Sequence, residues 1–391
     1  MIRSAHAIAA ISSLILGAAV ARAQANIAEP VQRSSQHDYR IVQVVDGLIN
    51  PWSMAFLPNG DMLVTERPGR LRIVRKGALL PTPVVGVPAV VARGQGGLLD
   101  VALHPDFARN RYIYLSFSKP VDNLATTAVV RAKFENDALS EVQEIFVADT
   151  KGAPGHFGSR LAFDKSGFLF VTVGDRQAPP TGDLAAHPAQ DFSNHQGTIN
   201  RLYDDGRVPA DNPFVDKAGY KPEIWSKGHR NPQGLAINPA TDDVWETEHG
   251  PQGGDELNLI RKGLNYGWPI IGFGVNYGAG NTIHASTRKA GLEQPMFFWV
   301  PSIATSSIMF YTGDKFPNWK GSVFVGGLVG EQLARLTIDG TNKVELVDVL
   351  VKKRGRIRDV RQGPDGFIYL ATEKQDGTGS PIFRLEPVAR R

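Results

Sequence analysis

The chain has 391 residues, of which 43 are Lys or Arg and 39 are Asp or Glu, so its formal net charge is only +4. No basic run carries interleaved aromatic residues, and the sequence therefore gives no support for a nucleic-acid partner. The chain contains no cysteine, which excludes disulfides, a thiolate nucleophile, cysteine-ligated zinc and a covalently attached c-type haem.

The N-terminal segment has the features of a secretory signal. Arg3 and His6 precede an apolar run over residues 7–20, and residues 21–23 (Ala-Arg-Ala) have the small-x-small pattern of a cleavage site. The run is too short to span a bilayer comfortably, and no later segment is long and apolar enough. We therefore expect a periplasmic or secreted protein without a membrane span, with a signal peptide at residues 1–23, a linker at 24–37 and one domain at 38–391.

From Tyr39 onwards, one sequence unit recurs six times. Each copy has a short apolar strand, a turn rich in Pro, Asn, Asp or Gly, and a second strand rich in β-branched and aromatic residues. A period of about 40–50 residues, stretched here by insertions, is the signature of a β-propeller. The six copies cover residues 53–66, 97–117, 159–175, 233–248, 306–326 and 358–373.

The repeat predicts an all-β fold, a six-bladed β-propeller of four-stranded antiparallel sheets. Radial repetition protects the sheet edges that an open all-β protein would expose. The strand-like run over residues 39–45 is expected to help close the ring against the last blade. The insertion over residues 177–220, which contains an Asp204-Asp205-Gly206 turn, is expected to lie over one face.

A propeller places equivalent positions of its blades around one axis, so a polar residue just before each innermost strand should face a shared pocket. Singly, a lone His is usually a satisfied polar residue and a lone Arg a solvated charge. Several arginines at one axis would repel one another unless an anion lay between them, and guanidinium groups bind carboxylates bidentately. The repeat thus predicts a site for a polyanionic, carboxylate-bearing ligand, formed by Gln95, His156, Arg230, Asn231, Ser302, Arg356 and Arg358.

Two further features carry chemistry. His156 is the base at such a position whose usual pKa suits neutral pH, and Asp175, at the end of the following strand, could fix its tautomer. The loop over residues 248–256 contains Gly250, Pro251 and Asp255, whose carbonyl and carboxylate oxygens suit Ca²⁺. Asp, Gly and Pro are also the usual residues of surface turns, so the loop taken alone favours an ordinary turn.

Together these motifs resemble the soluble, pyrroloquinoline quinone (PQQ)-dependent sugar dehydrogenases of the glucose/sorbosone dehydrogenase family. The resemblance extends over residues 41–385, nearly the whole expected mature chain. Any one motif alone would be a weak signal, but the set in this order is a strong one. Its most specific parts are GQGGLLDVALHPDF (94–107), GHFGSRL (155–161), VGD (173–175), GHRNPQGL (228–235), EHGPQGGDELNLI (248–260), NYGWP (265–269) and GRIRDV (355–360).

The resemblance implies PQQ over the central channel and oxidation of the anomeric hydroxyl of an aldose to a lactone, with hydride passing to the quinone. It implies His156 as general base, Asp175 as its support, Gln95 near the reacting atoms and Arg230 polarising the quinone. A separate electron acceptor would then reoxidise the cofactor. The resemblance further implies that Arg230, Asn231, Ser302, Arg356 and Arg358 bind the cofactor, that the carbonyls of Gly250 and Pro251 bind a catalytic Ca²⁺, and that Asp255 with the carbonyls of Glu256 and Tyr266 binds a structural Ca²⁺.

The chain departs from the glucose-oxidising members of that family at two positions. Where they carry a cofactor-binding Lys after the second strand of the fifth blade, this chain has Val329, which cannot bind a carboxylate. Where they carry an Asp before the catalytic His, this chain has Gly155, which removes one sugar contact. The second departure favours the broader aldose dehydrogenase branch, and the preferred aldose stays open.

Two other hypotheses stay open. A Ca²⁺-dependent lactonase-type hydrolase also uses a six-bladed propeller, but such sites place carboxylates and Asn around an axial metal, whereas the axial positions here are Arg and His. A binding propeller without chemistry would not need His156 and Asp175, and the fold alone does not exclude it.

Overall fold

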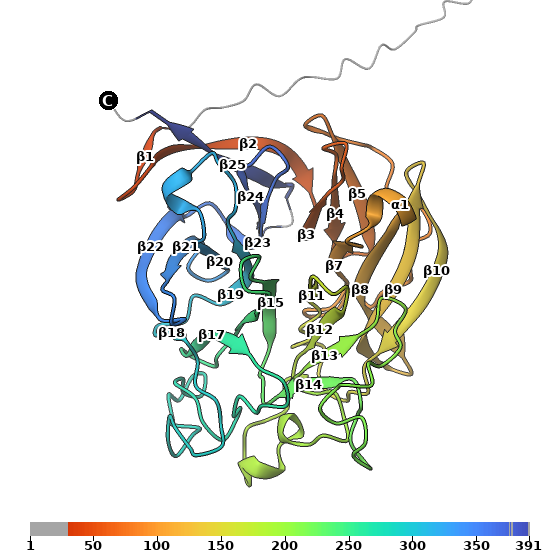
Figure 1. Ribbon diagram of the computed structural model, residues 1–391, viewed down its shortest axis with the longest axis vertical. Coiled ribbons are helices and arrows are strands. Elements are labelled where there is room, and N and C mark those ends of the chain that lie inside the picture. The colour runs from red at the N-terminus through yellow and green to blue at the C-terminus, as the bar shows by residue number, and fades with distance from the viewer. Residues whose placement is uncertain (1–29, 375, 377, 390–391) are drawn as a thin grey trace, which may run out of the picture.

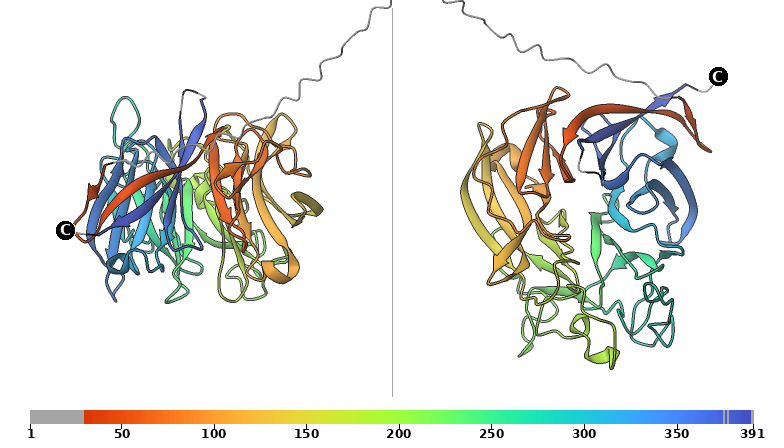
Figure 2. Two further views of the ribbon diagram at one scale, coloured as in Figure 1. Left: turned by 90° about the horizontal axis from the view of Figure 1, so that it is seen from above. Right: turned by 180° about the vertical axis from the view of Figure 1, so that it is seen from behind.

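The computed structural model describes residues 30–374, 376 and 378–389, and the expected signal peptide lies outside the described residues. Six antiparallel sheets are arranged as blades around one axis (Figure 1). Figure 2 shows the same ring from above and from behind. The predicted six-bladed propeller is therefore confirmed. No helix in the described part of the chain has the length and apolar character needed to cross a membrane.

Each blade is built outward from its first strand, and the first strands of neighbouring blades pack beside one another around the axis. Blade 1 comprises β3 (Pro51–Phe56), β4 (Met62–Glu66), β5 (Arg70–Arg75) and β6 (Ala78–Leu79), and blade 2 comprises β7 (Leu98–Leu103), β8 (Tyr112–Val121), β9 (Leu124–Glu135) and β10 (Ala138–Val147). Blade 3 comprises β11 (Leu161–Phe163), β12 (Leu169–Val173), β13 (Thr198–Leu202) and β14 (Ile224–Lys227), and blade 4 comprises β15 (Pro232–Ile237), β16 (Val244–Glu248), β17 (Asp255–Ile260) and β18 (Phe297–Trp299). Blade 5 comprises β19 (Thr305–Phe310), β20 (Val323–Gly327), β21 (Gln332–Ile338) and β22 (Val344–Lys352), and blade 6 comprises β23 (Arg356–Gln362), β24 (Ile368–Glu373), β25 (Ser380–Val388), β2 (Asp38–Leu48) and β1 (Gln32–Arg33). The helical segments are α1 (Phe107–Asn110), η1 (Leu184–Ala186), η2 (Pro188–Gln190) and η3 (Pro317–Trp319).

The two ends of the described chain close the ring together. Strand β2 pairs antiparallel with β25, with Tyr39 opposite Pro387 and Ile41 opposite Leu385. The expectation that residues 39–45 seal the last blade is thus confirmed (Figure 1). Blade 6 has five strands rather than four, because β1 adds a two-residue edge strand within the range expected to be a linker.

Part of the segment expected to be an insertion, residues 177–220, belongs to a blade. The segment contains β13, which pairs with β12 as the third strand of blade 3, Val171 lying opposite Asn200. The sequence Thr-Ile-Asn-Arg-Leu lacks apolar alternation because Asn200 and Arg201 are buried polar residues there. That composition hid the strand from a search based on apolar patterns.

The hydrophobic core lies between adjacent blades. Trp245 and Leu257 of blade 4, for example, pack in one cluster with Ile308, Val323 and Leu336 of blade 5. Alternate residues of each strand therefore face opposite neighbours, which is the period-two pattern in the sequence. Because both faces of a blade are covered, the strands read as nearly continuous buried runs.

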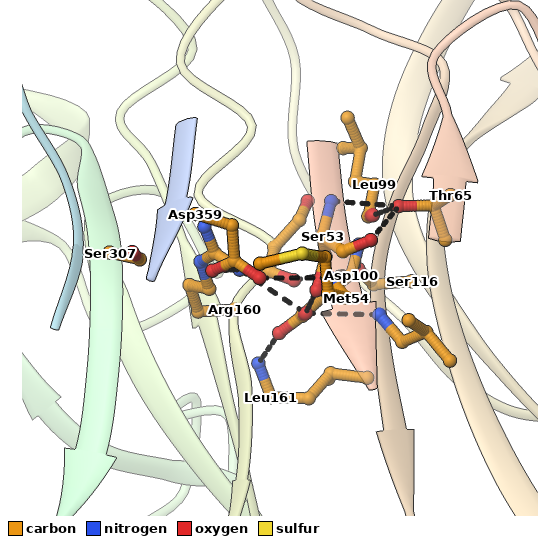
Figure 3. Close-up of polar contacts among 12 residues, drawn as sticks. Ser53, Met54, Thr65, Leu99, Asp100, Ser116, Arg160, Leu161, Ser307 and Asp359 are labelled. Atoms are coloured by element: carbon orange, nitrogen blue, oxygen red, sulfur yellow. Dashed lines mark hydrogen bonds and ion pairs between the residues drawn. The ribbon is translucent and has the colours of Figure 1, made fainter. Parts of the chain in front are cut away.

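The axis itself is held by buried charges. Arg160, which is 1% exposed, places its Nη1 atom 3.0 Å from Asp359 Oδ1 and 3.3 Å from Asp100 Oδ1 (Figure 3). Its Nε atom donates to the Gln233 carbonyl at 2.7 Å, and its Nη2 atom donates to the Arg358 carbonyl at 3.2 Å. One side chain of blade 3 thereby joins blades 2, 4 and 6 beneath the residues predicted to form the site.

Candidate active site

A cavity of about 180 Å³ lies on the axis, and all six blades contribute to its lining. Gln95, Arg356 and Arg358 of the predicted set line it directly. Phe157, the neighbour of His156, lines it too. Of the seven residues predicted to share one pocket, Gln95, Arg356 and Arg358 line this cavity. Arg230 lines a smaller second cavity, and His156, Asn231 and Ser302 line neither.

His156 is held in a fixed orientation before β11. Its backbone N–H donates to Gln95 Oε1 at 2.7 Å, and its φ of 47° lies in the left-handed region that is uncommon for non-glycine residues. A Cβ atom at Gly174 would lie 2.3 Å from the His156 carbonyl oxygen, so only glycine fits where the chain leaves β12. These constraints bring the imidazole against the next residue of the VGD motif, Asp175.

Asp175 binds the imidazole and is itself tied to the surrounding loops. Its Oδ1 atom lies 2.6 Å from His156 Nδ1, and its Oδ2 atom accepts a hydrogen bond from Trp268 Nε1 at 2.8 Å. Its backbone N–H donates to the Arg230 carbonyl at 2.8 Å. The structure thus brings together three side chains that lie far apart in the sequence.

The protonation states of this pair follow from burial and charge. Burial lowers the pKa of His156, although the neighbouring Asp175 carboxylate opposes that shift. Burial alone would raise the pKa of Asp175, but the charges of His156 and Arg230 hold it below its usual value. At neutral pH the pair is therefore a neutral imidazole beside a carboxylate. Because a carboxylate only accepts hydrogen bonds, Nδ1 carries the proton and Nε2 the lone pair of a general base.

Arg230 contacts both the 248–256 loop and Asp175, the partner of His156. Its Nη1 atom donates to the carbonyls of Gly250 at 2.7 Å and His249 at 3.3 Å. Its guanidinium lies 5.2 Å from the centre of the Trp268 ring, and its backbone N–H binds the buried Glu248 carboxylate. The arginine therefore holds one of the two loop carbonyls that the sequence offered as Ca²⁺ ligands, that of Gly250.

His249 was missed by the sequence interpretation and lies at the centre of the site. It lines both the axial cavity and a smaller neighbouring cavity formed with Arg230 and Trp268. Burial lowers its pKa well below the usual value, and the charges of Arg230, His156 and Arg358 lower it further. His249 thus lies beside Arg358 in the axial cavity and beside Arg230 in the smaller one. The EHGP motif contained the residue, but a search limited to positions before inner strands excluded it.

Two more residues of the cavity were missed, Arg67 and Glu373. Glu373 Oε2 lies 2.8 Å from Arg358 Nη2 and 3.6 Å from Arg356 Nε, while Glu373 Oε1 lies 3.6 Å from Arg67 Nη1. Both residues stand at the ends of second strands, Arg67 just after β4 and Glu373 at the end of β24. The offset that found the other residues could not find these.

Asp255 and Ser302 brace the 248–256 loop and line neither cavity. Asp255 Oδ1 accepts from Gly250 N at 3.0 Å and from Ser302 Oγ at 2.8 Å, and its Oδ2 atom accepts from Ile303 N at 2.9 Å. The other candidate metal ligands, Pro251, Glu256 and Tyr266, line the smaller cavity together with Gly250. Asp255 thus contacts Gly250 but does not line the cavity that the other candidate ligands share.

Beside this loop lies a buried acidic cluster that the sequence interpretation did not single out. Asn258 Nδ2 donates to Glu246, Glu248 and Glu256 at 3.1, 3.2 and 3.3 Å, and His229 Nδ1 lies 3.1 Å from Glu248. Burial, and then the Glu248 charge, raise the pKa values of Glu246 and Glu256 well above their usual range. Ligand atoms of His229, Glu246 and Glu248 lie within 4.8 Å of one another, a grouping that could hold a cation.

Four buried nitrogen atoms at the site have no hydrogen-bond partner among the described residues. They are Arg230 Nε, Asn231 Nδ2, His249 Nε2 and Arg358 Nε. A buried donor without an acceptor costs about 1–3 kcal/mol, so such atoms are normally satisfied. A ligand rich in carbonyl and carboxylate oxygens would satisfy the three that belong to Arg230, Asn231 and Arg358, and these residues therefore fit a carboxylated quinone.

Comparison with known proteins gives a consistent result. Residues 48–384 match the family model described as Glucose / Sorbosone dehydrogenase. Aldose sugar dehydrogenase YliI of Escherichia coli is 44% identical over 338 residues, which cover 85% of this chain and 89% of that protein. Quinoprotein glucose dehydrogenase B of Acinetobacter calcoaceticus is 27% identical over 429 aligned positions, covering 88% of each chain. The PQQ-bound aldose sugar dehydrogenase of Streptomyces coelicolor superimposes with a TM-score of 0.72 at 30% identity, covering 88% of this chain and 96% of that one.

Proposed function

Because the chain belongs to the glucose/sorbosone dehydrogenase family, we propose that it oxidises the anomeric hydroxyl of aldose sugars to the lactone with PQQ as the hydride acceptor. The observation that carries this proposal is the His156–Asp175 pair beside three buried donors that need acceptors, on Arg230, Asn231 and Arg358. PQQ, when bound, supplies two-electron redox chemistry that no side chain of this protein has. All other parts of the reaction fall to the residues of the chain.

His156 is the general base of the proposed reaction. Its Nε2 atom takes the proton of the anomeric hydroxyl, while Nδ1–H stays on the Asp175 carboxylate. Asp175 stabilises the imidazolium that forms and keeps the ring oriented. Gln95 holds the backbone of His156 and lines the cavity, so it restricts where the sugar can lie.

Arg230, Asn231, Arg356 and Arg358 are proposed to hold the quinone through its oxygen atoms. Three of them have a buried nitrogen without a partner, which supports that role. Arginine suits it because its planar fork binds carboxylates in two-point contacts. Ser302, whose hydroxyl is committed to Asp255, would act by bracing the loop.

For the metal we propose Ca²⁺, bound by the carbonyls of Gly250 and Pro251, where it would supply a Lewis acid. The Gly250 carbonyl already accepts from Arg230, so the arginine and the ion would share it or exchange there. A second, structural Ca²⁺ is proposed beside Glu256 and Tyr266, with Asp255 supporting the loop. The unpartnered oxygens Glu246 Oε1 and Asn258 Oδ1 of the adjacent acidic cluster support a hard cation in this region.

The proposed location is the periplasm or the exterior, and the proposed partners are an aldose and a separate electron acceptor. The lactonase hypothesis ranks second. Its support is the acidic cluster with Asn258, which has the donor chemistry of such hydrolases. Glu246 and Asn258 are both 0% exposed, however, so they offer no open coordination position to a substrate.

The test is the absorption spectrum of the protein reconstituted with PQQ and Ca²⁺, recorded before and after addition of an aldose. We expect bleaching of the oxidised quinone band, and turnover when a dye acceptor is added. The matched control omits PQQ and measures lactone hydrolysis. No spectral change with any aldose would contradict the proposal, and hydrolysis without PQQ would favour the lactonase.

Asp175→Asn is expected to lower kcat/KM for sugar oxidation by up to about 10⁴-fold, the cost when Asn replaces the carboxylate that holds a general-base histidine in one tautomer. The acid limb of the pH profile should also move. His156 is active when neutral, so activity is lost as pH falls through its pKa, which lies below the usual value. Asp175 raises that pKa, and its removal should shift the limb to lower pH. An unchanged limb would contradict the pairing.

A further inference from the structure

Arg67 faces the same cavity as Arg356 and Arg358, although it comes from blade 1 and they come from blade 6. Among the described residues, Glu373 is the carboxylate within 3.6 Å of all three guanidinium groups. The Arg67 and Arg356 side chains are only 20% and 22% exposed, and those of Arg358 and Glu373 only 8% and 6%. Three cations therefore share one carboxylate in a poorly solvated corner.

The charges in this corner favour a further anion. Burial lowers the pKa of Arg67 and Arg356, and their neighbouring guanidinium charges lower it further, against the attraction of Glu373. Burial would raise the pKa of Glu373, but the three arginines hold it below its usual value. Three guanidinium groups thus face one carboxylate, which leaves an excess of positive charge in the corner. Like charges at this spacing are stabilised when an anion lies between them.

Arg67 is held so that one of its nitrogens is left for the cavity. Its Nη2 atom donates to the Gly94 carbonyl at 2.6 Å, and its Nε atom to the Gly96 carbonyl at 3.4 Å. A Cβ atom at Gly97 would lie 2.1 Å from the Arg67 carbonyl oxygen, so the GQGG loop can pack here only with glycine. The Nη1 atom remains beside Glu373, at the wall of the cavity.

Val329 contributes no positive charge to the cavity. The positive charge comes from the corner formed by Arg67, Arg356 and Arg358. Val329 is 67% exposed, has no charge and does not line the cavity, while its neighbour Leu328 does. Blade 5 therefore contributes only an apolar contact to the lining. The next two blades around the ring, blades 6 and 1, supply the three arginines.

We infer that Arg67 is a further binding residue for a carboxylate of the quinone, and that Glu373 competes with that carboxylate for the three arginines. The inference rests on the proposed function. A carboxylated ligand entering the corner would take over part of the role of Glu373. Arg67 would then couple the bound anion to Gln95, since its side chain binds the carbonyls on both sides of that residue.

The test compares binding of PQQ with binding of its trimethyl ester, which has the same rings and no carboxylate charge. Affinities are measured by quenching of tryptophan fluorescence, since Trp52 lines the cavity. Arg67→Gln should weaken PQQ binding by about 10- to 100-fold, the worth of one charge-assisted hydrogen bond, and leave ester binding unchanged. Glu373→Gln should act in the opposite direction and tighten PQQ binding, again without changing the ester.

Arg70→Gln is the matched control, because Arg70 lies in the same blade, pairs with buried Glu66 at 2.6 Å and does not line the cavity. It should leave both affinities unchanged. Equal loss of PQQ and ester in Arg67→Gln would overturn the inference and make Arg67 a support for the Gln95 loop. Unchanged PQQ affinity would overturn it as well. If the unmodified protein bound no PQQ, the proposed function itself would fail, a result distinct from both.

Discussion

His156→Asn is expected to lower sugar oxidation by about 10²–10⁴-fold, the usual contribution of a positioned general base, while PQQ still binds. Asn is the replacement of choice because the residue has a φ of 47°, a conformation that Asn tolerates better than most residues. The side chain has no group that takes a proton at neutral pH. Stopped-flow measurement of quinone reduction by an aldose would isolate this step from reoxidation by the acceptor.

His195→Asn is the control for this substitution. His195 is also buried, at 3% exposure, and its Nε2 atom lies 3.4 Å from the Glu223 carboxylate. Its Nδ1 atom accepts from the Asp149 backbone N–H at 2.9 Å, so both ring nitrogens already have partners and neither is left to act as a base. The control should therefore cost stability without a comparable loss in the rate of quinone reduction. Equal rates in the His156 variant and the unmodified protein would refute the assignment of the base.

Arg160→Met is expected to lower the free energy of unfolding by about 3–5 kcal/mol, because it removes the fully buried cation of Asp100 and Asp359 and leaves them only the partly exposed Arg361. Both carboxylates are 0% exposed, so water cannot replace the guanidinium (Figure 3). Chemical denaturation followed by fluorescence would measure the loss. Adding Asp100→Asn and Asp359→Asn should recover part of it, since the uncompensated charges disappear.

Arg361→Met provides the comparison within the same network. Arg361 lies 3.0 Å from Asp359 and 3.3 Å from Asp100, but its side chain is 25% exposed. Water can reach the vacated side of the pair, so the loss should be smaller than for Arg160. If the two variants were equally stable, desolvation would not be what makes the axial network important.

The fold could be predicted because a short sequence pattern recurs in every blade and each copy lies within one continuous segment. Six copies of one strand-turn-strand unit are visible as apolar runs separated by turn residues, and the structure places each copy as the first two strands of a blade. Strand β13 was missed since its buried Asn200 and Arg201 interrupt the apolar pattern. A strand stabilised by buried polar contacts within its own blade cannot be found from hydrophobic alternation.

The candidate site was predictable where a side chain precedes an inner strand, as for Gln95, His156 and Arg230. Arg67 and Glu373 lie at the ends of second strands. The repeat does not reveal that residues at these positions reach the cavity. Residue chemistry was also insufficient for Asp255. Its carboxylate suits a metal, but backbone N–H groups and Ser302 surround it, which depends on how three loops meet.

The seal between β2 and β25 bears on the order in which the molecule can be assembled. During synthesis β2 emerges early and its partner β25 emerges last. Blade 6 therefore has an unpaired strand edge until translation nears its end. A truncated chain that stops before β25 would retain that edge, and exposed strand edges pair with other chains. Loss of either terminus therefore has the same consequence: an open ring that is prone to association.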